Sequence, residues 1–377
     1  LKEGEYVALQ YGKTYKVEVV DNSFNFFVNS GFYKSGQVVH EGDTILISTS
    51  ETLEDLGHSC LYSRKEIGLL GGEQILLKPN KKNVDTKFLN YYSKFFCVEL
   101  KRYATGLKVF RFDVNDLKNI STLSPPLKEQ TQIASYLDIK TKAIDKKISL
   151  LQQKITHYKA YRKTLINETV TKGLDKNVKL KDSGIKWIEQ IPEHWNIKRI
   201  KDIFTISRGR AIARTELKQN GKYPVYSSQT KNNGILGYID TFDFNANLLT
   251  WTTDGVNAGT VFIRKGKFSC TNICGTLSPL ASSKLFLKYM SLSVQESTRH
   301  NKRIDTNGAK IMSNEMAVIS VVYPPKKEQE EIADFLDSRT SIIDKINNNI
   351  TAQISTLKEL RKTLINEVVT GKVKIVK

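Results

Sequence analysis

The feature that most constrains this chain is an internal repeat of 47 residues. Residues 125–171 align without a gap on residues 324–370, at an offset of 199. The sequence RKTLINE recurs intact at Arg162–Glu168 and Arg361–Glu367. Chance does not produce agreement over this length, so both segments are expected to adopt the same structure.

Each copy predicts one long helix. A proline pair precedes it, and proline is tolerated in a first helical turn because its missing N–H would have no partner there. No further proline or glycine occurs until Gly173 in the first copy and Gly371 in the second, and glycine is a natural helix stop. At a rise of 1.5 Å per residue, about 43 helical residues would span roughly 65 Å.

Apolar residues recur at heptad spacing along both copies, which is typical of a coiled coil. Because neither helix can bury this stripe alone, we expect the two helices to pair within the chain in antiparallel orientation. That pairing would place the two globular segments at opposite ends, related by a pseudo-two-fold axis. The alternative is that each helix packs on its own globular domain. The predicted seam residues are Ile133, Leu137, Ile144, Ile148, Leu151 and Ile155 in the first copy and Ile332, Leu336, Ile343, Ile350, Ile354 and Leu357 in the second.

The repeat divides the 377 residues into alternating globular and helical parts. A chain of this length is expected to form two or three domains. The two globular segments are similar in length but unlike in sequence. The predicted boundaries are a first globular domain at 1–124, a helix at 125–173, a linker at 174–191, a second globular domain at 192–323, a helix at 324–372 and a tail at 373–377.

Both globular segments contain short β-favouring runs separated by turns, followed by one helical pattern. We therefore expect an α+β fold, with a curved sheet in each domain. The predicted strands are Glu5–Gln10, Thr14–Val20, Asp43–Ser48 and Gln74–Lys78, then Lys222–Ser227, Gly234–Ile239, Leu248–Thr252, Thr260–Arg264 and Thr271–Leu277; the predicted helices are Lys87–Arg102 and Lys284–Glu296.

The charge of the chain points to a polyanionic partner. Lysine and arginine total 58 against 39 acidic residues, a net charge of +19, and such a field attracts nucleic acid. The alternative is an ordinary basic protein from an AT-rich genome. No stretch of about 18 apolar residues predicts a membrane span, and no signal peptide or dense cysteine framework is evident, so we expect a reducing cytoplasm.

Polar and basic residues cluster on predicted loops of the second globular segment. Asparagine and glutamine can bond adenine at two positions, and lysine and arginine can bond guanine or phosphate, so these clusters predict contacts to double-stranded DNA. The alternative is that they are ordinary turn residues. The candidates are Arg208, Arg210 and Arg214, then Tyr226, Ser228, Gln229, Thr230, Lys231 and Asn232, and finally Thr253, Asp254 and Asn257.

The sequence argues against a catalytic centre. An adenine methyltransferase needs an (N/D)PP(Y/F) motif, whereas Ser124–Leu127 and Tyr323–Lys326 supply only its prolines. No glycine-rich cofactor loop is present, and the histidines form no cluster with acids or cysteines. Cys270 and Cys274 lack a second pair at zinc spacing, so we predict buried thiols and no metal site.

Several motifs resemble those of type I restriction-modification DNA specificity subunits. They are PPLKEQ and PPKKEQ at the helix starts, the IAxxLD that follows, the RKTLINExVT endings, and DSGIKWIEQIPEHW at Asp182–Trp195. The stretch YPVYSSQTKNNGILGYID is similar to part of a target recognition domain in that family. ALQYGK at Ala8–Lys13 resembles it loosely, and adds Gln10, Tyr11 and Lys13 as DNA-binding candidates.

The resemblance implies a division of labour. Each globular domain would recognise one half of a split DNA target, while the paired helices would set the spacer and bind two modification subunits. Those partners would bind S-adenosylmethionine and methylate adenine, and restriction subunits that use ATP and Mg²⁺ to translocate DNA would join them. This chain would bind no cofactor itself.

The chain departs from the family pattern at its start. The family usually carries a copy of the SGIxWIxxIPxHW segment before its first recognition domain, but this sequence begins LKEGEYVALQ. We therefore expect roughly twenty further residues there, by the repeat logic. Two other functions stay open: a stand-alone DNA-binding coiled-coil protein, and the specificity region of a single-chain restriction-modification enzyme.

Overall fold

The structure is a computed structural model that describes residues 3–305 and 308–375. It divides into two compact units, each of which combines a sheet-rich domain with parts of both long helices. Unit 1 comprises the residues up to 153 and those from 350 onward, and unit 2 comprises residues 154–349. Within the described ranges, no helix is long and apolar enough to cross a membrane.

Each copy of the repeat forms one continuous helix, as predicted. Helix α4 spans Leu127–Lys172 and helix α7 spans Lys326–Val369. Both begin directly after the second proline of the pair, where proline costs no helical hydrogen bond. Gly173 and Gly371 follow with φ of +78° and +72°, the left-handed conformation that ends helices and that glycine adopts without steric penalty.

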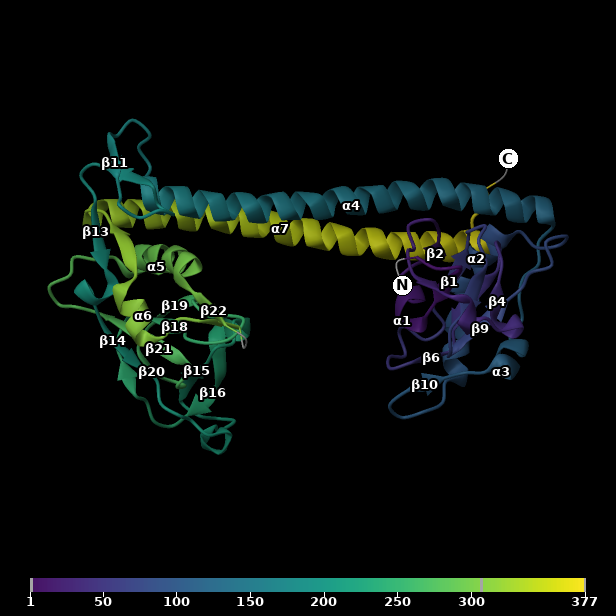
Figure 1. Ribbon diagram of the computed structural model, residues 1–377, viewed down its shortest axis with the longest axis horizontal. Coiled ribbons are helices and arrows are strands. Elements are labelled where there is room, and N and C mark those ends of the chain that lie inside the picture. The colour runs from purple at the N-terminus through teal and green to yellow at the C-terminus, as the bar shows by residue number, and fades with distance from the viewer. Residues whose placement is uncertain (1–2, 306–307, 376–377) are drawn as a thin grey trace. The chain divides into compact units, whose positions relative to one another are not determined.

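The two helices are antiparallel within each unit (Figure 1). In unit 1, Ile133 and Leu137 near the start of α4 share a buried cluster with Ile365 and Val368 near the end of α7. Unit 2 shows the converse, because the end of α4 there packs against the start of α7 through Ile166, Val170, Ile332 and Leu336. Only in an antiparallel pair does the N-terminal end of one helix pack against the C-terminal end of the other in both units.

The predicted seam residues of the two long helices are buried or half-buried. Eight of the twelve predicted residues are at most 9% exposed: Ile133, Leu137, Ile148, Ile332, Leu336, Ile343, Ile350 and Ile354. The other four are half-buried: Ile144, Leu151, Ile155 and Leu357. Burying one such aliphatic side chain stabilises a fold by about 2 kcal/mol, so the seam is a large part of the helix–helix interaction.

The long helices also pack on the sheet-rich domains, so both packing modes that the sequence allowed occur together. A buried glutamine near the start of each helix makes the same hydrogen bonds. Gln130 donates to Pro125 O at 2.8 Å and accepts from Asp85 N at 2.9 Å. Gln329 donates to Pro324 O at 2.8 Å and accepts from Phe286 N at 2.8 Å. The internal repeat therefore extends to individual hydrogen bonds.

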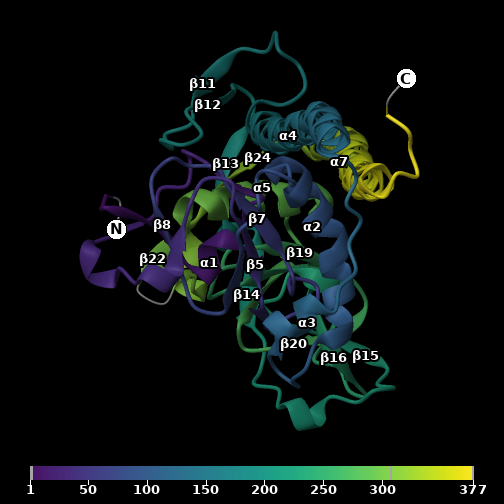
Figure 2. The same cartoon turned by 90° about the vertical axis from the view of Figure 1, so that its right-hand side faces the viewer.

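The domain of unit 1 is built from two four-stranded sheets rather than from the single curved sheet predicted. Helix α2 (Thr86–Leu100) lies beside the strands of the second sheet (Figure 2), and Asp85 caps its N-terminus. The first sheet has the order β3 (Phe27–Val28), β1 (Tyr6–Leu9), β8 (Gly68–Leu70), β4 (Val38–Val39), and the second β2 (Val19–Val20), β7 (Ser59–Tyr62), β5 (Thr44–Ile47), β9 (Gln74–Leu77). The strands β6 (Thr49–Ser50) and β10 (Phe110–Arg111) pair separately, and the helices α1 (Tyr11–Thr14) and α3 (Val114–Lys118) are short.

One strand prediction in this domain is largely wrong. The run Thr14–Val20 alternates like a strand, but only β2 at its end pairs with a neighbour. Thr14 instead ends α1, where its hydroxyl donates to Gln10 O at 3.1 Å. A local side-chain hydrogen bond thus favours a helical turn over the extended backbone.

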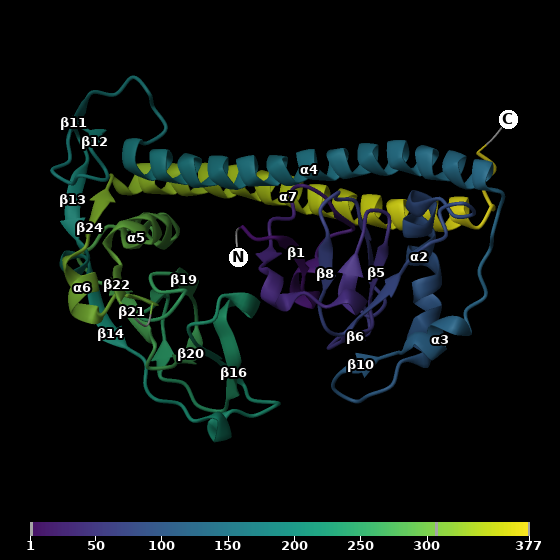
Figure 3. The ribbon, with the colours of Figure 1, turned by 45° about the vertical axis from the view of Figure 1, so that its right-hand side comes forward.

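The domain of unit 2 also contains two four-stranded sheets, and several of their strands are labelled in Figure 3. Their orders are β14 (Phe204–Arg208), β21 (Cys274–Pro279), β18 (Leu248–Thr252), β19 (Val261–Arg264), and β16 (Ile235–Ile239), β15 (Tyr223–Tyr226), β20 (Lys267–Cys270), β17 (Phe244–Asn245). Three two-stranded pairs accompany them: β11 (Leu180–Asp182) with β12 (Gln190–Pro192), β13 (Asn196–Arg199) with β24 (Ser320–Tyr323), and β22 (Arg303–Asp305) with β23 (Gly308–Lys310). The helices are α5 (Leu287–Asn301) and α6 (Ser313–Val318).

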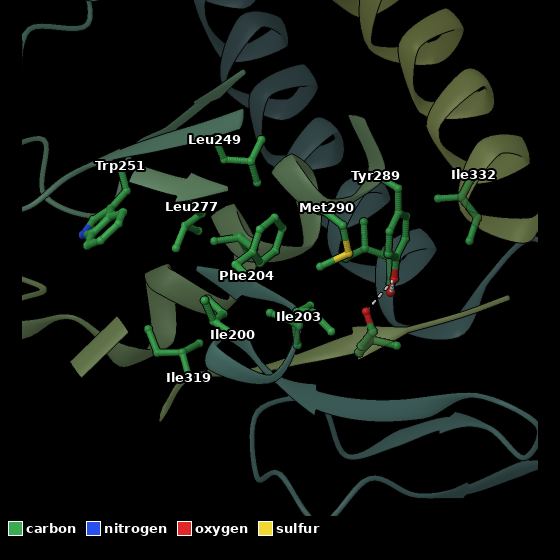
Figure 4. Close-up of a cluster of buried hydrophobic side chains, with 14 of the residues drawn as sticks. Ile200, Ile203, Phe204, Leu249, Trp251, Leu277, Tyr289, Met290, Ile319 and Ile332 are labelled. Atoms are coloured by element: carbon green, nitrogen blue, oxygen red, sulfur yellow. Dashed lines mark hydrogen bonds between the residues drawn. The ribbon is translucent and has the colours of Figure 1, made fainter. Parts of the chain in front are cut away.

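One hydrophobic core joins the sheet β14-β21-β18-β19, α5 and the long helices in unit 2 (Figure 4). Phe204, Leu249, Trp251 and Leu277 extend into it from the strands. The hydroxyl of the fully buried Tyr289 on α5 donates to the carbonyl oxygen of Val170 at the end of α4, at 2.9 Å. This core fixes the sheet β14-β21-β18-β19 to the helix pair.

The segment predicted as a linker, residues 174–191, is folded. It forms most of the hairpin β11–β12, and Ile188 and Ile191 are buried in the core of unit 2. Trp195 follows the hairpin, and its indole N–H donates to Glu328 at 2.9 Å. The motif Asp182–Trp195 is thus part of the packing at the start of α7.

Candidate nucleic-acid interface

The candidate residues between Tyr226 and Asn232 lie on the loop that joins β15 to β16 in unit 2. The loop is closed at its base by Ser227 N, which donates to Gly234 O at 2.9 Å. The amide of Asn257 donates to Ser228 O at 3.0 Å, and that of Gln229 donates to Ile235 O. Gln229 and Asn257 therefore use their amide N–H groups to shape this loop.

The tip of this loop presents polar side chains to solvent. Thr230, Lys231 and Asn232 are exposed, whereas Tyr226 and Ser228 are half-buried. Asn232 and Asn233 have φ of +49° and +50°, and Gly234 follows with +79°. Three successive residues in the left-handed region form a tight turn that directs the preceding side chains outward.

The three arginines at the start of the domain have different environments. Arg210 is held by Glu216 at 2.8 Å and by Asp243 at 3.3 Å, and the hydrogen bond that it donates to Glu216 is the main reason that its pKa is raised. Arg208 is exposed and donates to Asn272 O. Arg214 is also exposed. Arg208 and Arg214 are therefore better placed than Arg210 to meet a phosphate.

The third polar cluster is only partly on the surface. Thr253 is fully buried, so its side chain does not lie on the surface as the sequence pattern suggested, and its contact with DNA stays a prediction. The sequence pattern placed it in an open turn. Instead, Thr253 N donates to Ile273 O and Thr253 O accepts from Ile311 N, and these hydrogen bonds enclose the residue. Asp254 is half-buried and pairs with Lys310 at 3.9 Å.

In unit 1 the three candidates lie on and beside α1. Gln10 is exposed, and the ring of Tyr11 is stacked on that of Tyr15 with centroids 5.6 Å apart. The Lys13 ammonium lies 4.6 Å from the centre of the Phe26 ring, a cation–π contact that leaves it half-buried. These residues form one small aromatic and basic surface.

Arg264 is a feature that the sequence analysis missed. It ends β19, is 1% exposed, and donates to Asn233 O in the loop just described at 2.8 Å. The signal available was the alternation of β19, which places Arg264 on the same face as Phe262 rather than in a turn.

Among the side chains that the structure describes, no group of three or more His, Cys, Asp or Glu residues could hold a metal ion. Cys270 and Cys274 are buried, as expected, and burial raises their thiol pKa values to about 12 and about 11. Both are therefore neutral thiols at physiological pH, which makes them poor metal ligands and nucleophiles.

Comparison with known proteins gives one family. The profile of the type I restriction modification DNA specificity domain matches residues 2–156 and again residues 192–356. A putative type I specificity subunit of Mycoplasma pneumoniae is 34% identical over 241 residues, which are 63% of this chain and 89% of that protein. The specificity subunit of the type I restriction enzyme MpnII from the same organism is 37% identical over 165 residues, 44% of this chain and 48% of that one.

Two solved structures share the fold. A chain from a study of complex assembly and conformational transition of the type I R-M system superimposes with a TM-score of 0.73, at 14% identity, covering 91% of this chain and 86% of that one. The HsdS subunit of Thermoanaerobacter tengcongensis gives 0.54 at 14% identity, covering 91% and 85%. Each match of the family profile contains one sheet-rich domain and the first part of the long helix that follows it.

Proposed function

The chain belongs to the family of type I restriction modification DNA specificity domains, and we propose from this that it recognises a two-part DNA target for a restriction-modification complex. The observation that carries the proposal is the duplication. The family profile matches twice, and each match is a different sheet-rich domain followed by the first part of one of the two repeated helices. Two unlike domains on repeated helices suit a target with two unlike half-sites.

The proposed contacts to DNA are made by loops of both domains. In unit 2 the loop tip with Thr230, Lys231 and Asn232 would contact base edges, while Arg208 and Arg214 would neutralise phosphates. In unit 1 the surface around α1, with Gln10, Tyr11 and Lys13, would do the same for the other half-site. The net charge of +19 would supply salt-dependent affinity for both.

The long helices are proposed to bind two modification subunits. Tyr161 on α4 is 56% exposed, and Leu360, its equivalent in the repeat, is 53% exposed on α7. In unit 2, Tyr161 lines an apolar groove of about 580 Å³ together with Leu165, Leu174 and Phe335. An exposed apolar residue at the same repeat position in each unit fits two copies of one partner on equivalent surfaces.

Chemistry is proposed to reside on the partners. S-adenosylmethionine would bind to the modification subunits, and ATP and Mg²⁺ to the restriction subunits, with adenine as the methylated base. The buried, neutral thiols of Cys270 and Cys274 are poor nucleophiles, which is consistent with a scaffold that binds DNA without acting on it.

Two experiments test the proposal. The tagged chain should co-purify with a DNA methyltransferase, and methylation mapping of the host genome should reveal a split motif that disappears when the chain is deleted. Exchange of residues 188–323 for the same domain of a relative should change one half of the motif and leave the other half intact. Loss of both halves, or a motif that is independent of the chain, would contradict the proposal.

A further inference from the structure

Arg264 in unit 2 is buried without an opposite charge. Its guanidinium carbon lies 3.6 Å from the ring centre of Tyr226 and 4.4 Å from that of Phe262, so it is held between two aromatic rings. Its Nε donates to Thr250 Oγ1 at 3.1 Å and its Nη1 to Asn233 O at 2.8 Å. Among the described residues, no carboxylate forms an ion pair with it.

Such an environment is unfavourable for a side chain that serves only to fill space. Transfer of a cation out of water is costly unless hydrogen bonds and charges replace the lost hydration. Unit 1 offers a contrast, because Arg64 is also buried but pairs with Glu66 at 2.7 Å. Arg264 has carbonyl, hydroxyl and aromatic partners instead, and one of those partners is the backbone of the loop between β15 and β16.

The backbone that Arg264 holds is strained. Asn232, Asn233 and Gly234 are successive left-handed residues, a conformation that asparagine adopts singly and that rarely extends over three positions. Strained backbone persists where its surroundings determine it strongly, and such sites cluster where ligands bind. The hydrogen bond from Arg264 to Asn233 O is a contact to the middle residue of this turn.

The fit between arginine and turn is close. A side chain at Gly234 would place its Cβ 2.9 Å from Arg264 Nη2 and 3.2 Å from Gln229 O. The turn and the guanidinium therefore occupy adjoining space with little clearance. The residues directly before the middle of the turn are Lys231 and Asn232, whose side chains are exposed.

We infer that Arg264 is a positioning residue for DNA specificity: from beneath the sheet surface it holds the Asn232–Gly234 turn in the shape that directs Lys231 and Asn232 toward one half-site. The inference rests on the proposed function of the loop. Arg264 itself does not touch DNA. It acts as a rigid, planar donor, which lysine cannot replace because an ammonium lacks the flat face that stacks between two rings.

The test uses a bacterial strain without methylation of its own that expresses the full chain together with the modification subunit that co-purifies with it. Methylated positions across the genomic DNA of that strain give the recognised motif for the unchanged chain and for Arg264→Lys. The expected result is at least a tenfold loss of preference at one or more base pairs of a single half-site. The other half-site and the yield of complex stay unchanged.

A second variant approaches the same contact from the loop. Gly234→Ala should reduce the preference at the same base pairs. If Arg264→Lys yields no complex, Gly234→Ala provides the test. Arg64 is the matched buried arginine of unit 1, and Arg64→Lys should leave the preference at the half-site of unit 1 unaltered. A merely structural role for Arg264 would reduce methylation at all sites with the motif preserved, and that result overturns the inference. Absence of any motif with the unchanged chain overturns the proposed function as well.

Discussion

Arg361 of α7 pairs with Asp145 of α4 in unit 1, with 2.9 Å between Nε and Oδ1. The repeat offset of 199 converts these two residues into Arg162 and Asp344, and these pair in unit 2 at 3.3 Å. A contact from i to j that recurs as a contact from j to i is the mark of an isologous, two-fold arrangement. The pseudo-two-fold relationship of the repeat is therefore visible within the ion pairs of each unit.

The two arginines should differ in importance. Arg361 also donates to Glu18 at 2.6 Å and its side chain is 17% exposed, whereas that of Arg162 is 38% exposed. Arg361→Gln should lower the free energy of unfolding by about 2 kcal/mol, because charged hydrogen bonds are lost in a partly buried site. Arg162→Gln should cost about 0.5 kcal/mol, as for a surface pair. Urea denaturation of the full chain measures both, and equal losses would show that the third partner, Glu18, contributes nothing.

Acid should weaken unit 1 through Asp138. Burial raises the pKa of this carboxyl, but hydrogen bonds from Lys87 and Tyr91, each at 2.8 Å, outweigh it and leave the pKa below the usual 3.8. Because the folded-state pKa is depressed, the stabilisation is complete above pH 3.8 and is lost as the pH falls toward the folded-state pKa. Asp138→Asn should lower stability at neutral pH by about 1 kcal/mol and remove this part of the acid sensitivity.

The measurement is the free energy of unfolding between pH 7 and pH 3 for both proteins. Asp182→Asn serves as a control, since Asp182 is exposed. Parallel pH profiles for the unchanged chain and Asp138→Asn would contradict the prediction.

The long helices were predictable because periodicity and repetition are properties of the sequence itself. The loops were not, because their roles depend on contacts between distant residues. Thr253 lies in a polar run, yet it is buried under backbone bonds to Ile273 and Ile311. Arg264 looks like an ordinary strand end, yet Tyr226, more than thirty positions earlier, stacks on it. Tertiary packing decided both cases: strand alternation could place Arg264 on the same face as Phe262, but it could not show which distant residues would pack there.

Lys231 should contribute to DNA affinity without contributing to stability. It is exposed at the tip of the loop, so Lys231→Ala removes a positive charge and no internal packing. The expected effect is about a tenfold loss of affinity, as for one phosphate or base contact. The slope of log K against log salt concentration should also become shallower by about one. Lys327→Ala is the matched control, since Lys327 is an exposed lysine of the same unit on α7. Binding of the assembled complex to target duplex at several salt concentrations measures both, and equal effects would mean that only total charge matters.

Lengthening both long helices should test whether they set the spacer. Positions that pair across the helices have numbers that add to 506, as in Arg361 with Asp145 and Arg162 with Asp344. Insertion of one heptad at Gln153 and one at Gln353 therefore adds matched residues to both helices and preserves the a/d pattern. Seven residues add roughly 10 Å, close to the rise of three base pairs in a duplex that repeats about every 34–36 Å. Methylation mapping should then show the same two half-sites with a spacer longer by about three base pairs.

Insertion in only one helix is the control. It should abolish the complex, because the seam residues beyond the insertion would lose their partners. Changed bases within a half-site, at an unchanged spacer, would contradict the role of the helices as the element that measures distance.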